Sequence, residues 1–132
     1  MIDVFPIIIV THGKFAKALI ETSAMIAGKQ EKLYAVELEE GQSPESLKER
    51  IDALLTEKSL ILTDLFGASP FNASIKLLDR AEVVTGVNLP MLLELLMNRS
   101  IGVEEAAAIA ERAGREGIVN VRAKLSGGSK DS

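Results

Sequence analysis

Apolar residues along the chain follow two kinds of pattern. Short apolar runs bounded by turn-forming residues predict strands at 7–10, 33–38, 60–63 and 82–87. Longer segments with apolar residues three or four positions apart predict helices at 15–27, 44–56, 70–80, 91–96 and 103–115. Strands that alternate with helices predict an α/β fold, in which a doubly wound, mainly parallel sheet carries helices on both faces.

The end of the chain shows a different, strand-like alternation. From residue 118 to 125, apolar side chains alternate with polar ones, which predicts a fifth strand, half exposed, at the edge of the sheet. Residues 126–132 are rich in Gly, Ser, Lys and Asp, a composition typical of disorder. We therefore expect one domain over residues 1–125 and a disordered tail over 126–132.

Several residues indicate where helices begin, end and bury a face. Ser43 before a proline predicts a helix N-cap, and Gly28 and Gly117 predict helix C-termini. In the first helix, the residues at helical spacing are Phe15, Ala18, Leu19, Thr22, Met25 and Ile26. We expect Met25 and the leucines of residues 91–97 in the core.

Composition narrows the function classes. The chain has 132 residues, with 15 Lys and Arg against 19 Asp and Glu, so its formal net charge is −4. Its basic residues are scattered, which argues against a nucleic-acid partner. With no cysteine there is no disulfide, thiolate nucleophile or cysteine-bound metal, and a single histidine excludes a multi-histidine metal site. We expect neither a metal nor a cofactor.

Membrane signals are missing from the sequence. No apolar run approaches the roughly 20 residues of a membrane-spanning helix. Residues 1–10 contain Asp3 and Pro6 and lack the basic start and cleavage site of a signal peptide. We therefore expect a soluble, cytoplasmic protein.

Three polar loops follow predicted strands, at residues 11–13, 64–72 and 86–91. Because the carboxyl ends of parallel strands lie at one edge of a sheet, these loops should lie together where α/β proteins bind ligands. His12 is the candidate nucleophile, since a carboxylate such as Asp64 on one ring nitrogen leaves the other free to attack. From the residues alone, His12 could equally cap a helix, and Asp64 could be a solvated turn residue.

Smaller residues in these loops suggest an anion site. Gly13 removes side-chain bulk beside the ring of His12, and Gly67 could let backbone amides face an anion. Ser69 precedes Pro70, so its hydroxyl can serve as an N-cap, bind a phosphoryl group, or do both. No nucleotide-binding glycine motif is present. The glycines and Ser69 are therefore candidate phosphate-binding residues.

Three segments, 7–13, 64–72 and 86–92, together resemble the enzyme IIA component of the mannose family of the bacterial sugar phosphotransferase system. The resemblance extends to about residue 124, and three motifs in the right order are more specific than one. Within it, Ala68 stands where the family usually has a second glycine. The resemblance implies a doubly wound α/β fold whose last strand, antiparallel, is exchanged between the two subunits of a homodimer.

The resemblance also implies a function, that of a phosphoryl carrier. His12 would accept phosphate at Nε2 from the phosphocarrier protein HPr and pass it to a separate IIB component, with the membrane components IIC and IID reached only indirectly. Asp64 matches the aspartate that orients the histidine through Nδ1, and Ser69 matches the serine near the phosphate. The chemistry agrees, because phosphoryl transfer needs chiefly positioning and charge stabilisation.

Two alternatives from other classes remain at this point. One is a flavodoxin-like module that binds a flavin or nucleotide, although aromatic residues at 4% and the absence of Trp leave few stacking partners. The other is a hydrolase with Ser69, His12 and Asp64 as a triad. Against it, Ser69 lacks a G-x-S-x-G motif, and Pro70 has no N–H for an oxyanion hole.

Overall fold

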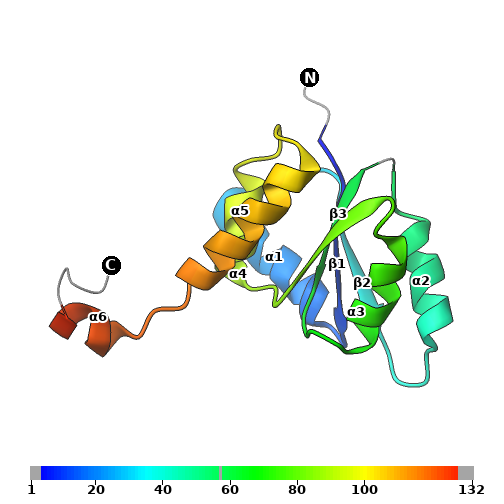
Figure 1. The fold of residues 1–132 in the computed structure, drawn as a ribbon, viewed down its shortest axis with the longest axis horizontal. Helices are drawn as coiled ribbons and strands as arrows, with labels where there is room; N and C mark the ends of the chain where they lie inside the picture. Colours follow the sequence, from blue (N-terminus) through cyan, green and yellow to red (C-terminus); the bar gives the residue numbers. More distant parts are fainter. Residues whose placement is uncertain (1–3, 57, 128–132) are drawn as a thin grey trace.

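The computed structural model describes residues 4–56 and 58–127. Within these ranges the chain forms a parallel sheet in the order β2-β1-β3-β4 (Figure 1). Its strands are β1 (Ile7–His12), β2 (Leu33–Leu38), β3 (Ser59–Thr63) and β4 (Ala81–Thr85). The four strands predicted from apolar runs are confirmed, with bounds that shift by at most two residues.

Helices cover both faces of the sheet, as predicted (Figure 1). One face carries α1 (Phe15–Ala27), α4 (Leu89–Leu96) and α5 (Val103–Glu116), and the other carries α2 (Pro44–Asp52), α3 (Ser69–Ser74) and the 3-10 helix η1 (Ile75–Leu77). Alternate residues of β1 enter the two cores, because successive side chains of a strand point to opposite faces. Both faces are therefore buried, which explains the continuous apolar runs of β1 and β3.

The predicted helix ends are confirmed at several positions. The Ser43 hydroxyl accepts a hydrogen bond of 3.1 Å from the backbone N–H of Ser46 at the start of α2. Gly28 ends α1 with a φ of 84°, in the left-handed region that favours glycine. Gly117 ends α5 for another reason, because a Cβ there would lie 2.5 Å from Pro90.

The predicted buried face of α1 is confirmed at Leu19 and wrong at its other positions. The helix buries Ala16, Leu19 and Ser23, whereas Met25 is 87% exposed and Phe15 45% exposed. Small side chains on either side of Leu19 allow the helix to lie close to the sheet, so its contact face combines Leu19 with alanine and serine and leaves Phe15, Met25 and Ile26 exposed. Leu92, Leu95 and Leu96 of α4 are buried in the core as expected, whereas Leu93 is half-buried.

The predicted fifth strand is not formed within the described chain. Residues 118–120 are irregular and α6 (Val121–Gly127) follows, extending away from the sheet (Figure 1). No strand among the described residues lies beside this segment, so local helix preferences decide its conformation. The Asn120 side chain accepts a hydrogen bond from the N–H of Ala123 at the start of the helix. Ser126 and Gly127, predicted to begin the tail, belong to α6, and residues 128–132 lie outside the described residues.

The order of the strands creates a switch point between β1 and β3. The chain moves from β1 to β2 on one side and then to β3 on the other. In such sheets the carboxyl ends of the strands that flank the switch point leave a crevice between diverging connections. His12 ends β1 and Asp64 directly follows β3, so the topology alone brings these two residues to one place.

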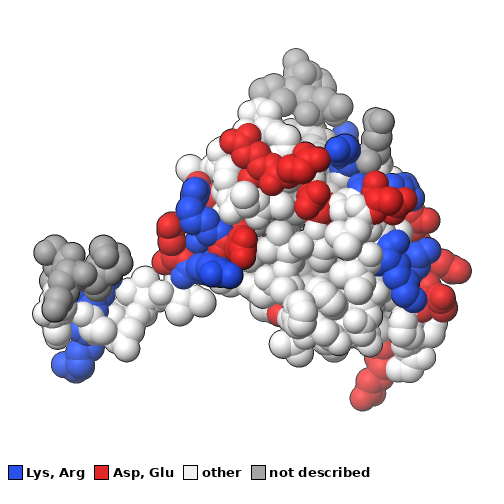
Figure 2. All heavy atoms as spheres, viewed as in Figure 1, with Lys and Arg blue, Asp and Glu red and all other residues white. Residues whose placement is uncertain are grey.

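The surface carries charges of both signs. Figure 2 shows acidic and basic side chains interspersed over the face in view. None of the described helices is long and apolar enough to cross a membrane.

Candidate functional site

A tight turn between β1 and α1 presents His12 at the edge of the sheet. Thr11 is fully buried, and its hydroxyl accepts a hydrogen bond of 2.8 Å from the N–H of Ala16. Gly13 adopts a φ of 54°, and its N–H donates to the carbonyl of Leu38 at 2.9 Å. These hydrogen bonds fix the backbone on both sides of His12, so the position from which its side chain projects is well defined.

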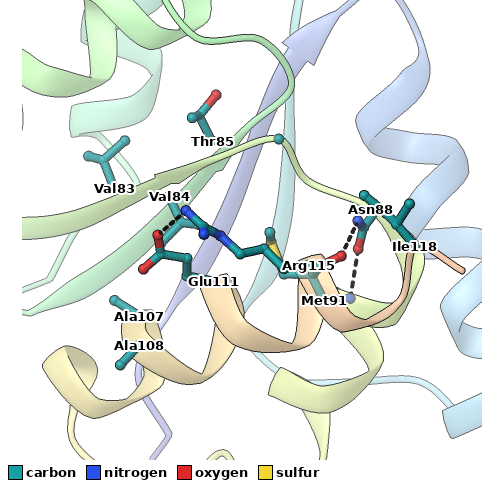
Figure 3. Close-up of a pocket in the computed structure, with 12 residues that line it drawn as sticks. Val83, Val84, Thr85, Asn88, Met91, Ala107, Ala108, Glu111, Arg115 and Ile118 are labelled. Carbon is teal, nitrogen blue, oxygen red and sulfur yellow. Dashed lines mark hydrogen bonds and ion pairs between the residues drawn. The ribbon is translucent and has the colours of Figure 1, made fainter. Parts of the chain in front are cut away.

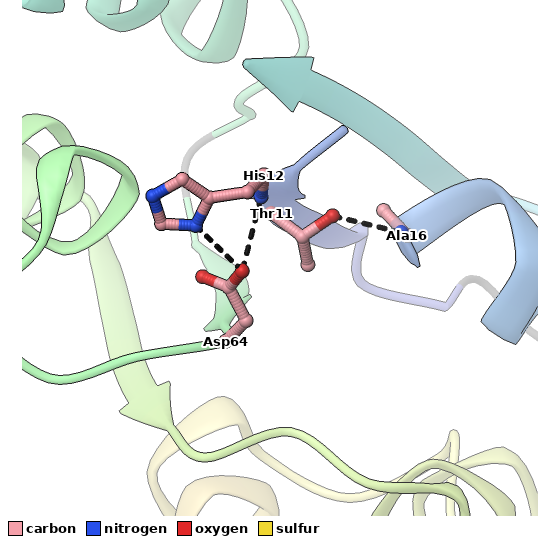
Figure 4. A network of polar contacts seen from close by, with 4 residues as sticks. All are labelled: Thr11, His12, Ala16 and Asp64. Atoms are coloured by element: carbon pink, nitrogen blue, oxygen red, sulfur yellow. Dashed lines mark hydrogen bonds and ion pairs between the residues drawn. The ribbon is translucent and has the colours of Figure 1, made fainter. Parts of the chain in front are cut away.

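Asp64 holds both the backbone and the ring of His12. Its Oδ2 lies 3.0 Å from the backbone nitrogen of His12 and 2.8 Å from Nδ1 (Figure 4). Because an ionised carboxylate can only accept hydrogen bonds, the ring carries its proton on Nδ1. The second ring nitrogen, Nε2, points away from Asp64 and makes no hydrogen bond with the described residues.

The side chain of His12 is more exposed to solvent than that of Asp64. The side chain of His12 is 49% exposed, whereas that of Asp64 is 14% exposed, and Asp64 Oδ1 is buried without a partner among the described residues. The carboxylate is therefore shielded while Nε2 is open. An imidazole held in this tautomer can attack an electrophile with the Nε2 lone pair, and the carboxylate can stabilise the positive ring that results.

The loop after β3 follows its predicted path except at the start of α3. Gly67 has a φ of 85°, and its carbonyl accepts a hydrogen bond of 3.3 Å from the side chain of Asn72. Ser69 is the first helical residue and not the N-cap, which is Ala68 and makes no side-chain cap. Ala68 has φ −89° and ψ 179°, a conformation open to any residue, so the loop needs no second glycine there.

Ser69 is not joined to His12 as a hydrolase triad would require. Within the described part of the chain, its hydroxyl makes no hydrogen bond with His12, whose Nδ1 contacts Asp64. The third predicted loop is structural, since Asn88 accepts a hydrogen bond from the N–H of Met91 and donates one to the carbonyl of Gly114. The site thus consists of His12 and Asp64, with the loop that contains Gly67 and Ser69 leading from Asp64 into α3.

A hollow of about 580 Å³ lies beside His12, and its far wall is not among the site residues predicted from the sequence. His12, Gly13 and Lys14 line one side, and residues 37–42 line the other. Arg50 braces this wall by donating hydrogen bonds to the carbonyl of Glu37 and to Gln42. The wall follows β2, so the rule that points to the carboxyl ends of strands could have indicated it.

This fold and site define a doubly wound α/β protein with an oriented, accessible imidazole at its switch point. Comparisons with known proteins then identify its family. Residues 6–113 match the family model described as the PTS system fructose IIA component, where PTS is the sugar phosphotransferase system. The chain therefore belongs to the family of fructose- and mannose-type IIA components of that system.

Individual relatives support this placement. The mannose-specific EIIAB component of Escherichia coli K12 is 38% identical over an alignment of 128 positions, and the match covers 89% of this chain and 40% of that protein. The fructose-specific EIIA component of Bacillus subtilis 168 is 38% identical over 70% of this chain and 69% of that protein. A crystal structure of a phosphotransferase system EIIA component from Streptococcus agalactiae superposes with a TM-score of 0.84 at 29% identity, over 89% of this chain and 98% of that one. The chain thus spans less than half of its E. coli relative.

Proposed function

We propose that this protein is a phosphoryl carrier that accepts phosphate on Nε2 of His12 from phosphorylated HPr and passes it to a IIB component. The observation that carries the proposal is the 2.8 Å contact between Nδ1 of His12 and Asp64, which leaves Nε2 as the free, exposed nitrogen. Family membership supports the same role. The reaction is a phosphotransfer between protein histidines, and it needs no metal or other cofactor from this chain.

The transfer can be written so that every bond is accounted for. The Nε2 lone pair forms the new N–P bond, the N–P bond of the donor breaks, and its electron pair returns to the donor nitrogen. The Nδ1 proton stays in the hydrogen bond to Asp64, whose carboxylate offsets the positive charge of the phosphorylated ring. In this proposal Gly13 leaves space for the phosphoryl group, and Ser69 and the backbone at Gly67 contact its oxygens.

The proposed partners follow from this chemistry and from the family. HPr supplies the phosphate and a IIB component takes it, so the membrane components IIC and IID are reached only through IIB. Such a relay places the protein in the cytoplasm. We propose no nucleic-acid partner, because Figure 2 shows no concentrated basic surface on the face in view and the net charge is −4.

The protein acts, in this proposal, as a homodimer that exchanges its last strand. Beside β4, which pairs only with β3 among the described residues, lies a groove of about 520 Å³ between that strand and α5 (Figure 3). The segment 118–125 alternates apolar and polar residues, and α6 buries none of its residues. Unwinding α6 therefore loses few packing contacts, and the segment 118–125 can then pair as a strand with β4 of a second copy.

Light scattering after size exclusion tests the dimer. The wild-type protein should have the mass of a dimer, and Val121→Asp should weaken association, because Val121 is exposed in α6 but would face the groove as a strand residue. A wild-type protein that stays monomeric at tens of micromolar, on the order of ordinary dimer affinities, would contradict strand exchange.

Intact-mass spectrometry tests the phosphoryl carrier itself. The protein is incubated with phosphoenolpyruvate, enzyme I and HPr at neutral to alkaline pH, beside His12→Ala and Ser69→Ala. We expect one acid-labile phosphate on the wild type, none on His12→Ala, and slower but real phosphorylation of Ser69→Ala. Normal phosphorylation of His12→Ala would refute the assignment, and a hydrolase would instead require Ser69 for any activity.

A further inference from the structure

Lys14 lies two residues after His12, in the turn that presents the histidine. It occupies the N-cap position of α1 without making a side-chain cap, and it is exposed. Its carbonyl accepts a hydrogen bond of 3.1 Å from the N–H of Ala18. Because this is a backbone hydrogen bond, a substitution of the Lys14 side chain can retain it. Within the described ranges the Lys14 ammonium group makes no ion pair or hydrogen bond, so the side chain has no structural task.

The hollow beside His12 has an uneven distribution of charge. Glu37, Glu39 and Glu40 line the wall opposite His12. Lys14 is the one lysine or arginine among the described residues that line this hollow. Asp64 adds a further negative charge beneath the ring. The lining of the hollow therefore supplies a single cation against several carboxylates.

This balance matters once a phosphoryl group is attached. A phosphoryl group carries about −1.5 to −2 charges near neutral pH, so on Nε2 it would meet carboxylates on the far wall of the hollow. Repulsion from these carboxylates disfavours the phosphorylated form unless a nearby cation offsets it. A lysine can do so, since its flexible stem carries an ammonium with three N–H donors to the group it approaches.

We propose that Lys14 binds the phosphoryl oxygens on His12 and thereby stabilises both the transferring group and the phosphorylated protein. This inference rests on the proposed function, and it assigns the role to a residue that neither the sequence motifs nor the oriented ring involves. Lys14 donates hydrogen bonds and keeps its proton, so the bonds formed and broken in the transfer are unchanged. Its contribution is electrostatic, and it should weaken as salt is added.

The test compares Lys14→Met with Lys17→Met and Lys14→Arg. Lys17 is exposed in α1, three residues after Lys14, and lies outside the lining of the hollow. Lys17→Met changes the net charge of the protein by the same amount as Lys14→Met. Phosphorylation is driven first by phosphoramidate, which needs no partner protein: its N–P bond breaks, ammonia leaves and the phosphoryl group joins Nε2. The equilibrium with phosphorylated HPr is then measured for the same proteins, at low and high salt.

Lys14→Met should reduce the rate with phosphoramidate and the phosphorylated share at equilibrium by about three- to tenfold at low salt, the size expected for one cation within roughly 7 Å of a dianion in water-like surroundings. The effect should shrink at high salt, Lys14→Arg should restore most of the loss, and Lys17→Met should match the wild type. Unchanged melting temperatures would exclude a folding effect.

Two results would overturn the role of Lys14. One is equal behaviour of Lys14→Met and Lys17→Met with both donors. The other is a defect confined to phosphorylated HPr, which would assign Lys14 to contact with the partner and not with the phosphoryl group. Failure of the proposed function looks different, because the wild type itself would then stay unphosphorylated beside active HPr.

Discussion

Replacing Asp64 with asparagine isolates the charge of the carboxylate that orients His12. Asp64 Oδ2 accepts hydrogen bonds from the backbone N–H and from Nδ1 of His12, at 3.0 and 2.8 Å. Asparagine keeps an oxygen acceptor of nearly the same shape but is neutral. The substitution therefore leaves a hydrogen bond to the ring possible, while it removes the negative charge that would face the imidazole in its proposed phosphorylated form.

The size of the effect follows from that difference. A hydrogen bond to a charged group contributes about 1.5–3 kcal/mol and a neutral one about 0.5–1.5 kcal/mol, so the exchange removes about 1–2 kcal/mol. Because His12 is 49% exposed, water screens part of the interaction and the lower half of this range applies. That lower half, about 1–1.5 kcal/mol, corresponds to a transfer about 5- to 13-fold slower. Asp64→Ala should be slower still, since it leaves the N–H of His12 without its acceptor.

Rapid-quench measurement of a single transfer from phosphorylated HPr, read by intact mass, gives the rate for each variant. The expected order is wild type, then Asp64→Asn, then Asp64→Ala, with melting temperatures recorded to separate a loss of fold from a loss of orientation. A rate for Asp64→Asn within twofold of the wild type would refute the argument that the carboxylate charge supports the transfer.

Three further substitutions test the packing that supports the site. Gly117→Ala should destabilise the protein by about 1–3 kcal/mol in urea unfolding, because its Cβ would lie 2.5 Å from Pro90 at a backbone φ of −75° that alanine itself accepts; wild-type stability would contradict this contact. Thr11→Val should lower the free energy of unfolding by about 1–3 kcal/mol, because it leaves the buried N–H of Ala16 without its acceptor. An unchanged free energy of unfolding would show that the hydrogen bond to the Thr11 hydroxyl does not stabilise the fold. The hydrogen bond from Lys58 lowers the pKa of Glu104, so at pH values above 4.5 Glu104→Gln should have a slightly lower melting temperature than the wild type. This difference in melting temperature should vanish as the pH falls through the lowered pKa. A difference that grows in acid would contradict the stabilising role of the ionised carboxylate.

The sheet and the paired site residues could be predicted from the sequence for a physical reason. Strands buried on both faces must be apolar at nearly every position, so the runs at β1 and β3 identify themselves. Polar residues directly after such runs then fall at the edge where parallel strands end. His12 and Asp64 are therefore predicted to lie together at this edge, and in the structure Nδ1 of His12 lies 2.8 Å from Oδ2 of Asp64.

Other features depend on interactions that a linear pattern does not contain. The buried face of α1 runs through Ala16 and Ser23, because close packing on a sheet favours small side chains that a search for large apolar residues overlooks. The segment 118–125 has an alternation that suits a strand, yet a strand needs a neighbour, and the described chain supplies none. The conformation of this segment is therefore decided by what lies beside it and not by its own spacing.

One carboxylate performs two tasks at this site, and the topology explains why. A carrier must expose Nε2 to a donor and then to an acceptor, so any group that orients the ring has to act from the Nδ1 side. The switch point places Asp64 at the end of the neighbouring strand, where Oδ2 accepts from both the backbone and the ring of His12. The main chain and the ring are thus held by one residue, and no second side chain is needed to orient the ring from the side that partners approach. Variants of Asp64 should therefore slow acceptance from HPr and delivery to IIB by similar factors, because both steps use the same ring orientation. A defect in only one step would show that Asp64 serves one partner instead.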